Sequence, residues 1–440
     1  MKVKLYTLLL LLIVSKCIYS NNDITGYWHG AVDRLGSIQL VEFNFYKESD
    51  SIKGTYNIPD MGLFEEPVTE IDIAFPNMKF RTFMGYFDAR YDTLTGEITG
   101  TNKKWDPSIN IHLKKMTAPV LLFNREYITF YNKEIKIAGT LFKPFGKITF
   151  PVVILIHGAD EPQSRRNWRY RYFAYFLAEH GYGALIYDKR GIDSSTGNND
   201  ADFYELAEDV SSGIKYLMTR EDVKKDKIGV LGASRGGWVA EICAAKIDNT
   251  AFAVLFLGPS VSVWEQQMDA VEYHMKQENY SIEAIDSALQ NNKQYFEAVN
   301  NKEKWDSFQK TLAPLQNKEW KQYLQLPESY NDSDMVWWRK NNYDPEEGLK
   351  NVKCPVLSIF GEDDVLVPPE RNFEKMQKYL SQSGQQFEIK IIPGLPHNIH
   401  FNQTLRGGEW NFPEAYWVWP KRSIVLEENI INWLKNVCSE

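Results

Sequence analysis

The sequence predicts two folded parts: a small all-β domain over residues 21–118, and an α/β domain with a mostly parallel sheet over residues 119–440. Three observations support this prediction. Up to about residue 115, apolar and polar residues alternate in short runs that end at Gly, Asn or Asp, which is typical of antiparallel strands. From residue 151, continuous apolar runs alternate with helical segments, which indicates βαβ units around a buried parallel sheet. Between residues 261 and 348 this alternation stops.

The composition is that of a globular chain. Of the 440 residues, 43% are hydrophobic and 25% are charged, which excludes a disordered, collagen-like or multi-span membrane protein. The net charge of −8, without a basic stripe, provides no attraction for nucleic acid, so we expect no nucleic-acid partner.

The first twenty residues have the pattern of a secretory signal. Lys2 and Lys4 are positive, residues 5–14 are mostly apolar, and Ser20 is a small residue suited to cleavage. Ten apolar residues are too few to cross a bilayer, which needs about 20. Removal of residues 1–20 takes away three lysines and changes the net charge from −8 to −11. We therefore expect an acidic, exported protein, periplasmic or extracellular, with no stable membrane span.

Cys17 offers an alternative, a lipid-anchored protein. Lipidation signals carry a small residue before the cysteine, and Lys16 at this position disfavours the alternative. The other cysteines, Cys243, Cys354 and Cys438, are odd in number and lack CxxC spacing, so no disulfide framework or zinc site is predicted. We expect Cys243 and Cys354, which lie in apolar surroundings, to be buried thiols.

The alternating segments of the first domain are short and closely spaced. They include residues 37–45, 79–91, 96–101 and 109–115. This spacing favours a barrel or a sandwich, and about ninety residues are too few for a propeller, which has four or more blades of about 40 residues.

The second domain opens with a predicted β-hairpin over residues 125–144, with its turn at Asn132-Lys133. The expected strands that follow are 151–158, 182–188, 227–234, 252–259, 354–364 and 387–394. Helices are expected at Trp168–His180, at 202–219, from Arg235 and near 422–436. Residues 261–348 are polar, helical in period and contain five tryptophans, so we expect a helical cap inserted over the sheet.

The sharpest motif is Gly232-Ala233-Ser234-Arg235-Gly236-Gly237, between an apolar strand and a helical segment. This is the context of a nucleophile elbow, where a tight turn exposes the serine hydroxyl above the sheet. Glycine at 232 and 236 relieves crowding in the turn. We therefore predict that Ser234 is a nucleophile, against the alternative of a structural turn.

Chain order selects its partners, because the acid and the histidine follow the serine in α/β enzymes with this elbow. His274 lies in the insertion, whereas His397 follows the strand 387–394 and is the predicted base, with His400 in reserve. The acid should follow the preceding strand. Of the three candidates there, we prefer Asp364 to Asp363; the third is Glu362.

An oxyanion hole requires two backbone donors. The residue after the nucleophile, Arg235, supplies one N–H group, and Ala159, which follows His157-Gly158 at the end of a strand, supplies the other. His157 precedes Ser234 in the chain, so we predict that it is structural.

Together these motifs resemble the α/β-hydrolase superfamily, and more narrowly the secreted bacterial esterases in which a small β domain precedes the hydrolase. The resemblance rests on IHG (156–158), YDKRGIDSSTG (187–197), GASRGG (232–237), GEDDVLVPP (361–369) and PGLPH (393–397), with ITGYWHG (24–30) and GEITGT (96–101) in the β domain. Serine aminopeptidase-like and prolyl-oligopeptidase-like proteins share the hydrolase motifs.

The chain departs from these relatives at the loop after His-Gly, which is usually rich in glycine. Here it carries Asp160 and Glu161, two carboxylates next to the predicted oxyanion hole. We hypothesise that Arg165, Arg166 or Arg235 neutralises them.

The resemblance implies a secreted serine hydrolase that cleaves carboxylic esters of small molecules through an acyl-enzyme. No metal or organic cofactor is expected, since HExxH, P-loop and GxGxxG motifs are missing from the sequence. One alternative is a peptidase that uses Asp160 and Glu161 to hold a substrate's ammonium group. Another is a glycan- or envelope-binding protein without catalysis. The aromatic cluster after His397 fits either a substrate pocket or packing against the last helix; it comprises Trp410, Phe412, Tyr416, Trp417 and Trp419.

Overall fold

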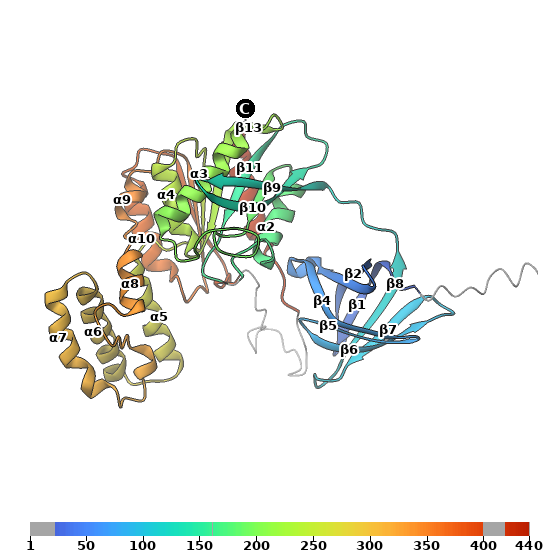
Figure 1. Cartoon of the computed structure of the whole chain (residues 1–440), viewed down its shortest axis with the longest axis horizontal. Helices are drawn as coiled ribbons and strands as arrows, with labels where there is room; N and C mark the ends of the chain where they lie inside the picture. The colour runs from blue at the N-terminus through green and yellow to red at the C-terminus, as the bar shows by residue number, and fades with distance from the viewer. Residues whose placement is uncertain (1–22, 161, 399–418, 440) are drawn as a thin grey trace, which may run out of the picture. The chain divides into compact units, whose positions relative to one another are not determined.

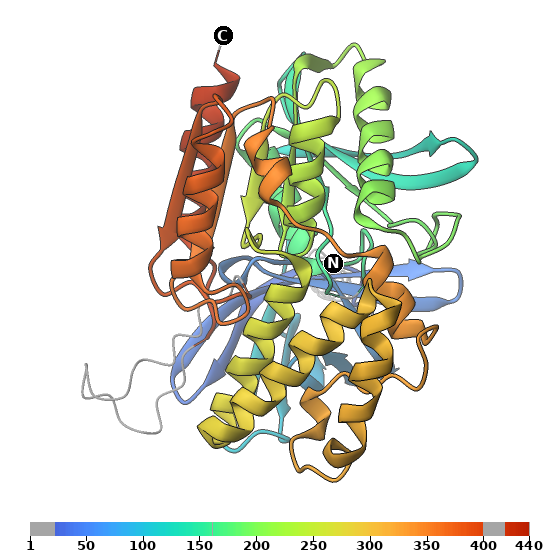
Figure 2. The same cartoon turned by 90° about the vertical axis from the view of Figure 1, so that its left-hand side faces the viewer.

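A computed structural model describes residues 23–160, 162–398 and 419–439 (Figures 1 and 2). Within these residues the chain forms two compact units. The first contains residues 23–121 and 419–422, and the second contains 122–398 and 423–439.

The first unit is a closed antiparallel barrel of eight strands in sequence order, drawn from blue to cyan in Figure 1. Pairing of β1 with both β2 and β8 closes it. The strands are β1 Gly26–Arg34, β2 Ser37–Glu48, β3 Ser51–Ile58, β4 Leu63–Ala74, β5 Asn77–Thr82, β6 Gly85–Asp92, β7 Glu97–Asn102 and β8 Ile109–Met116. The 3-10 helix η1, Pro59–Met61, joins β3 to β4. The predicted all-β domain is thus confirmed, as a barrel rather than a sandwich.

Large aromatic side chains fill the barrel. Trp28, Phe43, Phe45, Phe80 and Phe87 are each at most 1% exposed. Inward residues alternate with outward ones along strands such as β5 and β6, which explains the period-two pattern of the sequence. An eight-stranded barrel has an interior that such side chains can fill.

The second unit holds a sheet in the order β16-β15-β14-β13-β11-β12-β10-β9. The strands are β9 Phe123–Asn132, β10 Ile135–Pro144, β11 Phe150–Ile156, β12 Gly183–Tyr187, β13 Val223–Ala233, β14 Ala253–Phe256, β15 Val356–Gly361 and β16 Phe387–Ile392. β9 and β10 form the predicted antiparallel hairpin, β10 also pairs antiparallel with β12, and the six strands β11–β16 run parallel to one another. The mostly parallel sheet is confirmed.

Helices connect the parallel strands and continue through the insertion. They are α2 Trp168–Glu179, α3 Phe203–Met218, α4 Gly236–Lys246, α5 Val263–Gln277, α6 Ile282–Val299, α7 Lys302–Leu312, α8 Ser333–Lys340, α9 Glu346–Lys350, α10 Pro369–Leu380 and α11 Ile424–Cys438, with the 3-10 turns η2 Ala313–Leu315 and η3 Lys321–Tyr323. Of these, α10 was not predicted as a separate helix. None of the helices that the structure describes is long and apolar enough to cross a bilayer.

The insertion is helical, as expected, and Figures 1 and 2 show α5, α6 and α7 packed together. It has small apolar cores of its own, one of them built around Tyr295, Trp305 and Phe308. The start of the insertion is hydrogen-bonded to the residues that follow Asp364. Ser260 N–H donates to Asn372 Oδ1 on α10 (2.8 Å), and Gln266 on α5 donates to the carbonyl of Leu366.

Residues 419–422 belong to the barrel unit, although they directly precede α11. Trp419 is 4% exposed, and its Nε1 donates to the carbonyl of Ser37 (3.0 Å). Arg422 N–H donates to the carbonyl of Asp60 (2.8 Å). Trp419 therefore packs on the barrel, while the other four aromatic residues of the predicted cluster lie outside the described residues.

Cys243, Cys354 and Cys438 are buried free thiols, as predicted for the first two. Burial raises the pKa of all three, to about 12 for Cys354 and about 11 for Cys438. These thiols stay protonated at neutral pH, and none is an activated nucleophile.

Candidate active site

Ser234 lies in a sharp turn between β13 and α4. Its φ of +52° is in the left-handed region, an unusual conformation for a serine. The turn is held by Ser234 N–H, which donates to the carbonyl of Phe256 (2.9 Å), and by Gly237 N–H, which donates to the carbonyl of Ser234 (2.7 Å). The predicted strand–turn–helix geometry is present, and residues held in such conformations cluster at functional sites.

Three glycines make this turn sterically feasible. A Cβ on Gly232 would lie 2.1 Å from the carbonyl oxygen of Gly236, and one on Gly236 would lie 2.6 Å from that of Ile156. A Cβ on Gly237 would lie 2.6 Å from the Cα of Gly258. Real Cβ atoms do not approach backbone atoms so closely, so glycine at these positions lets α4 pack against the strand ends.

The structure brings the three predicted side chains together. His397 Nε2 lies 2.9 Å from Ser234 Oγ, and His397 Nδ1 lies 2.8 Å from Asp364 Oδ2. His397 and Asp364 follow β16 and β15, neighbouring parallel strands whose carboxyl ends meet at one edge of the sheet. The hydrogen bond to Asp364 fixes which imidazole nitrogen can face the serine.

Backbone groups hold the Asp364 carboxylate in place. Its Oδ1 accepts the N–H groups of Leu366 (2.9 Å) and Val367 (2.8 Å), and its side chain has no exposed surface. The neighbouring Asp363 is exposed. The preference for Asp364 agrees with this geometry.

The other candidates lie elsewhere. His274 is exposed on α5, and the reserve candidate His400 lies outside the described residues. Glu362 is exposed and accepts the N–H of Gly394 (2.9 Å), so it joins the two loops that carry Asp364 and His397.

Of the predicted oxyanion donors, one is next to the serine in the chain, and the other follows Gly158, whose ideal Cβ would lie 3.4 Å from Ser234 Cβ. Arg235 directly follows Ser234, and Ala159 is exposed on the loop after β11. The carbonyl of Gly158 accepts hydrogen bonds from Gln163 Nε2 (3.1 Å) and Arg235 Nη2 (3.2 Å). Because C=O and N–H point in opposite directions across a trans peptide, these bonds aim the Ala159 N–H away from both side chains.

The rest of this loop is tied to a buried aspartate. Asp188 is 1% exposed and accepts two hydrogen bonds from the Arg165 guanidinium (3.0 and 2.8 Å) as well as the Arg165 N–H (2.9 Å). Gly158 N–H donates to Tyr170 Oη (2.6 Å). Gln163, Tyr170 and Asp188 were not recognised from the sequence, since no motif marks a residue that acts through a loop backbone.

The hypothesis that Arg165, Arg166 or Arg235 neutralises the loop carboxylates is wrong for Asp160. Arg165 pairs with Asp188, and Arg166 pairs with Asp193. Asp160 instead accepts a hydrogen bond from Asn167 (2.8 Å) and lies 4.0 Å from Arg169 Nη1. These partners belong to the N-cap and the first turn of α2, and both are buried. Glu161 lies outside the described residues.

Asp160 nevertheless borders the serine. An ideal Cβ on Gly158 would lie 3.1 Å from Asp160 Oδ1 and 3.4 Å from Ser234 Cβ, so both side chains line the same small volume.

His157 packs between two aromatic rings. Its ring centroid lies 4.6 Å from that of Tyr170 and 4.9 Å from that of Tyr187. Burial lowers the pKa of His157 to about 4, so it is neutral at physiological pH. His157 is thus a buried, neutral packing residue, which fits the predicted structural role.

The mixed sheet, the elbow at the end of β13 and the helical insertion after β14 define an α/β-hydrolase with an N-terminal eight-stranded barrel. The chain belongs to the X-Pro dipeptidyl-peptidase (S15) family, whose model matches residues 104–391. The match begins in the last part of the barrel and ends before His397. The chain is therefore a serine hydrolase.

Curated and solved relatives are distant. The bifunctional esterase/perhydrolase DCH of Acinetobacter calcoaceticus is 24% identical over 264 residues, which cover 59% of this chain and 89% of that protein. An esterase structure from Pyrococcus furiosus is 18% identical with a TM-score of 0.40, covering 62% of this chain and 84% of that one. Acetyl xylan esterase 1 from Thermoanaerobacterium is 15% identical with a TM-score of 0.42, covering 74% and 87%.

Proposed function

We propose that this protein hydrolyses carboxylic esters through an acyl-enzyme formed on Ser234. The observation that carries the proposal is the hydrogen-bonded series from Ser234 to His397 to Asp364, with distances of 2.9 and 2.8 Å. A serine hydroxyl becomes a useful nucleophile when an adjacent base accepts its proton.

In the proposed reaction, Ser234 Oγ attacks the ester carbonyl carbon while His397 Nε2 takes the hydroxyl proton. Asp364 stabilises the resulting imidazolium and remains ionised. The N–H groups of Arg235 and Ala159 stabilise the negative oxygen of the tetrahedral intermediate. His397 then gives its proton to the leaving alkoxide, and a water activated by the same histidine releases the acid.

One of the relatives, the bifunctional esterase/perhydrolase, favours esters over peptides as the substrates of this protein. The match covers 89% of that relative's length. Relatives of this type also support a small-molecule substrate.

The first test is labelling with a fluorophosphonate probe, which reacts with activated serines. The wild-type protein should be labelled and Ser234→Ala should not. The wild type should also hydrolyse p-nitrophenyl acetate or butyrate. If the folded wild-type protein is not labelled, Ser234 is not an activated nucleophile and the proposal fails.

A second candidate activity is peptide cleavage from the N-terminus, favoured by the S15 family and by Asp160 next to Ser234. A carboxylate at this position can pair with a substrate's ammonium group. Aminoacyl and X-Pro p-nitroanilides test this activity, and Asp160→Asn should raise KM for them while KM for p-nitrophenyl acetate stays unchanged. If the wild-type protein cleaves the ester and none of the anilides, the peptidase candidate is excluded.

We further propose that the protein is exported and cleaved after Ser20. The positive and apolar segments of residues 1–20 support the proposal. Expression of the full chain in a Gram-negative host should give a periplasmic protein whose mass corresponds to residues 21–440. A mass that includes a lipidated Cys17 would show an anchored protein instead.

A further inference from the structure

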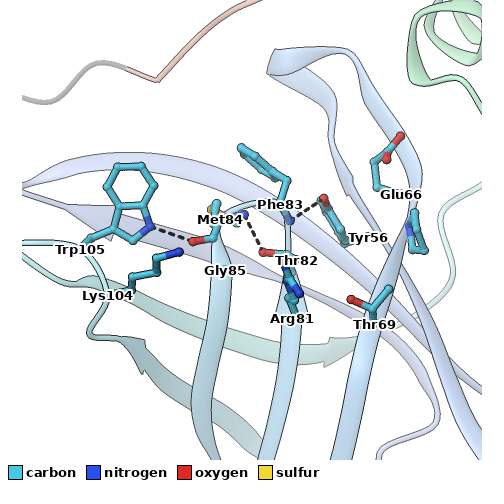
Figure 3. Close-up of a pocket in the computed structure, with 11 residues that line it drawn as sticks. Tyr56, Glu66, Thr69, Arg81, Thr82, Phe83, Met84, Gly85, Lys104 and Trp105 are labelled. Atoms are coloured by element: carbon cyan, nitrogen blue, oxygen red, sulfur yellow. Dashed lines mark hydrogen bonds between the residues drawn. The ribbon is translucent and has the colours of Figure 1, made fainter. Parts of the chain in front are cut away.

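The barrel has a hollow at one end. It measures about 630 Å³ and is bordered by the β5–β6 turn and the β7–β8 loop (Figure 3). Volumes of this size are typical of small-molecule sites, and barrel mouths are common places for them. Its floor contains the buried side chains of Tyr56, Thr82 and Met84.

Phe83 stands on the β5–β6 turn with its ring 54% exposed. Its backbone N–H donates to Tyr56 Oη (3.1 Å), and the two rings stack with centroids 6.3 Å apart. A largely exposed aromatic residue is thus held in position by a buried one.

Trp105 borders the same hollow from the β7–β8 loop. Its Nε1 donates to the carbonyl of Met84 (2.8 Å), and the Arg34 guanidinium lies 4.7 Å from its ring centroid. Figure 3 shows the rings of Phe83 and Trp105 projecting to the same side of the turn. Since these contacts fix both rings, little conformational entropy is lost when a ligand binds them.

Polar side chains of both charges line the rest of the hollow. Glu66 and Thr69 lie on β4, Arg81 on β5 and Lys104 on the β7–β8 loop. Arg81 is paired with Glu70, which lies outside the hollow (2.8 Å). This mixed lining offers both hydrogen-bond donors and acceptors and disfavours a ligand with a large charge of one sign.

We propose that the barrel mouth binds a neutral carbohydrate. Sugar hydroxyl groups both donate and accept hydrogen bonds, which suits a lining that contains carboxylate, hydroxyl and ammonium groups. The C–H faces of a sugar ring pack against aromatic faces, whose partial negative charge attracts them. This site lies within the barrel and is independent of the acyl-transfer chemistry proposed for Ser234.

Affinity electrophoresis of the full-length mature protein tests this proposal. Native gels contain one soluble neutral polysaccharide each, from a panel of xylan, mixed-linkage β-glucan, glucomannan and soluble starch. Ser234→Ala is used as the parent protein so that no ester on the polysaccharide is cleaved. At least one polysaccharide should retard the parent, and Phe83→Ala and Trp105→Ala should each raise the apparent Kd at least tenfold.

The matched control is Tyr46→Ala. Tyr46 is 39% exposed on β2, close to the β2–β3 turn, and alternate turns of an antiparallel barrel place it at the opposite end from Phe83. This variant should be retarded like the parent. Phe83→Ala and Trp105→Ala should keep the parent's circular dichroism spectrum and thermal unfolding curve, which shows that the barrel of each variant folds.

Two outcomes would overturn the proposal: no retardation by any polysaccharide of the panel, or retardation that Phe83→Ala and Trp105→Ala leave unchanged. A third result would assign the hollow to peptides instead: the parent binds members of a peptide library, Phe83→Ala and Trp105→Ala lose this binding, and no polysaccharide retards the parent.

Discussion

At the residue scale, Asp364 has the most constrained position of the three aligned side chains. It is fully buried, and its two oxygens are shared between His397 and two backbone N–H groups. The side chain of His397, by contrast, is 17% exposed. A carboxylate held in this way can orient the imidazole without moving itself.

Asp364→Asn should therefore lower kcat for p-nitrophenyl acetate by about 10⁴-fold, because an amide stabilises the wrong imidazole tautomer. Asp363→Asn is the matched control, since it makes the same chemical change at the adjacent exposed position. Steady-state kinetics of both variants measure the effect. Equal losses in the two, or a large loss in Asp363→Asn alone, would assign the acid differently.

Gln163 is a positioning residue for the proposed oxyanion hole. It is 3% exposed, and its amide holds the Gly158 carbonyl. Gln163→Glu keeps the size but removes the N–H donor, so kcat should fall about tenfold or more while KM changes little. Circular dichroism and separate values of kcat and KM distinguish this fall in kcat from a folding defect. A folding defect would lower the fraction of active protein, but the rate per fluorophosphonate-labelled Ser234 would stay the same.

At the scale of elements, local pattern predicted the parallel strands. β11, β12, β14 and β15 are buried on both faces and read as continuous apolar runs, whereas the edge strand β16 is mostly half-buried and contains Glu388 and Lys390. Local pattern also predicted the elbow and the two partner loops, whose residues follow strand ends. The turn within the segment 79–91 could not be predicted from local pattern. This segment contains β5 and β6, and the turn residues Phe83 and Met84 are apolar and continue the alternation. Barrel closure by β1 and β8 depends on pairing of distant segments, which no local pattern records.

The contact between α4 and α9 predicts a pH dependence of stability. Glu241 is 1% exposed, accepts a hydrogen bond from Tyr343 Oη (2.8 Å) and lies against Gly348. Burial raises the pKa of Glu241 well above its ordinary value of 4.5. The folded state therefore keeps a proton that the unfolded state releases above that value, so this group lowers stability progressively as pH rises.

Glu241→Gln retains the hydrogen-bond acceptor and cannot ionise. Urea unfolding at pH 5 and pH 8 should show a variant that gains stability over the wild type as pH increases. Parallel stability curves for the two proteins would mean that Glu241 has no raised pKa in the folded state.

At the scale of the whole molecule, the described residues pass from the barrel unit to the α/β unit at two places, after Leu121 and after Arg422, and residues 419–422 form a segment that returns to the barrel. The family match at residues 104–391 contains neither most of the barrel nor this returning segment. The sequence revealed Trp419 but not its partner, because Ser37 contributes a backbone carbonyl, which carries no side-chain signature.

Trp419→Ala should destabilise the barrel by about 3–5 kcal/mol, the usual cost of removing a buried tryptophan side chain. Hydrogen–deuterium exchange followed by mass spectrometry measures this by peptide. Peptides from β1–β3 should lose protection, and peptides from β11 and β13 serve as the internal control. Unchanged exchange throughout the barrel would show that the Trp419 contact contributes nothing to its stability.

The returning segment also has a consequence for the order in which the protein is made. All eight barrel strands precede the α/β unit in the sequence, yet Trp419 and Arg422, which also contact the barrel, follow that unit's last strand, β16. His397 lies shortly before these residues. The barrel can therefore gain the Trp419 and Arg422 contacts only after residue 422 has been synthesised, and His397, the proposed base for Ser234, is also made late. In the proposed reaction, the barrel contacts and the base for Ser234 therefore depend on the same late-synthesised part of the chain.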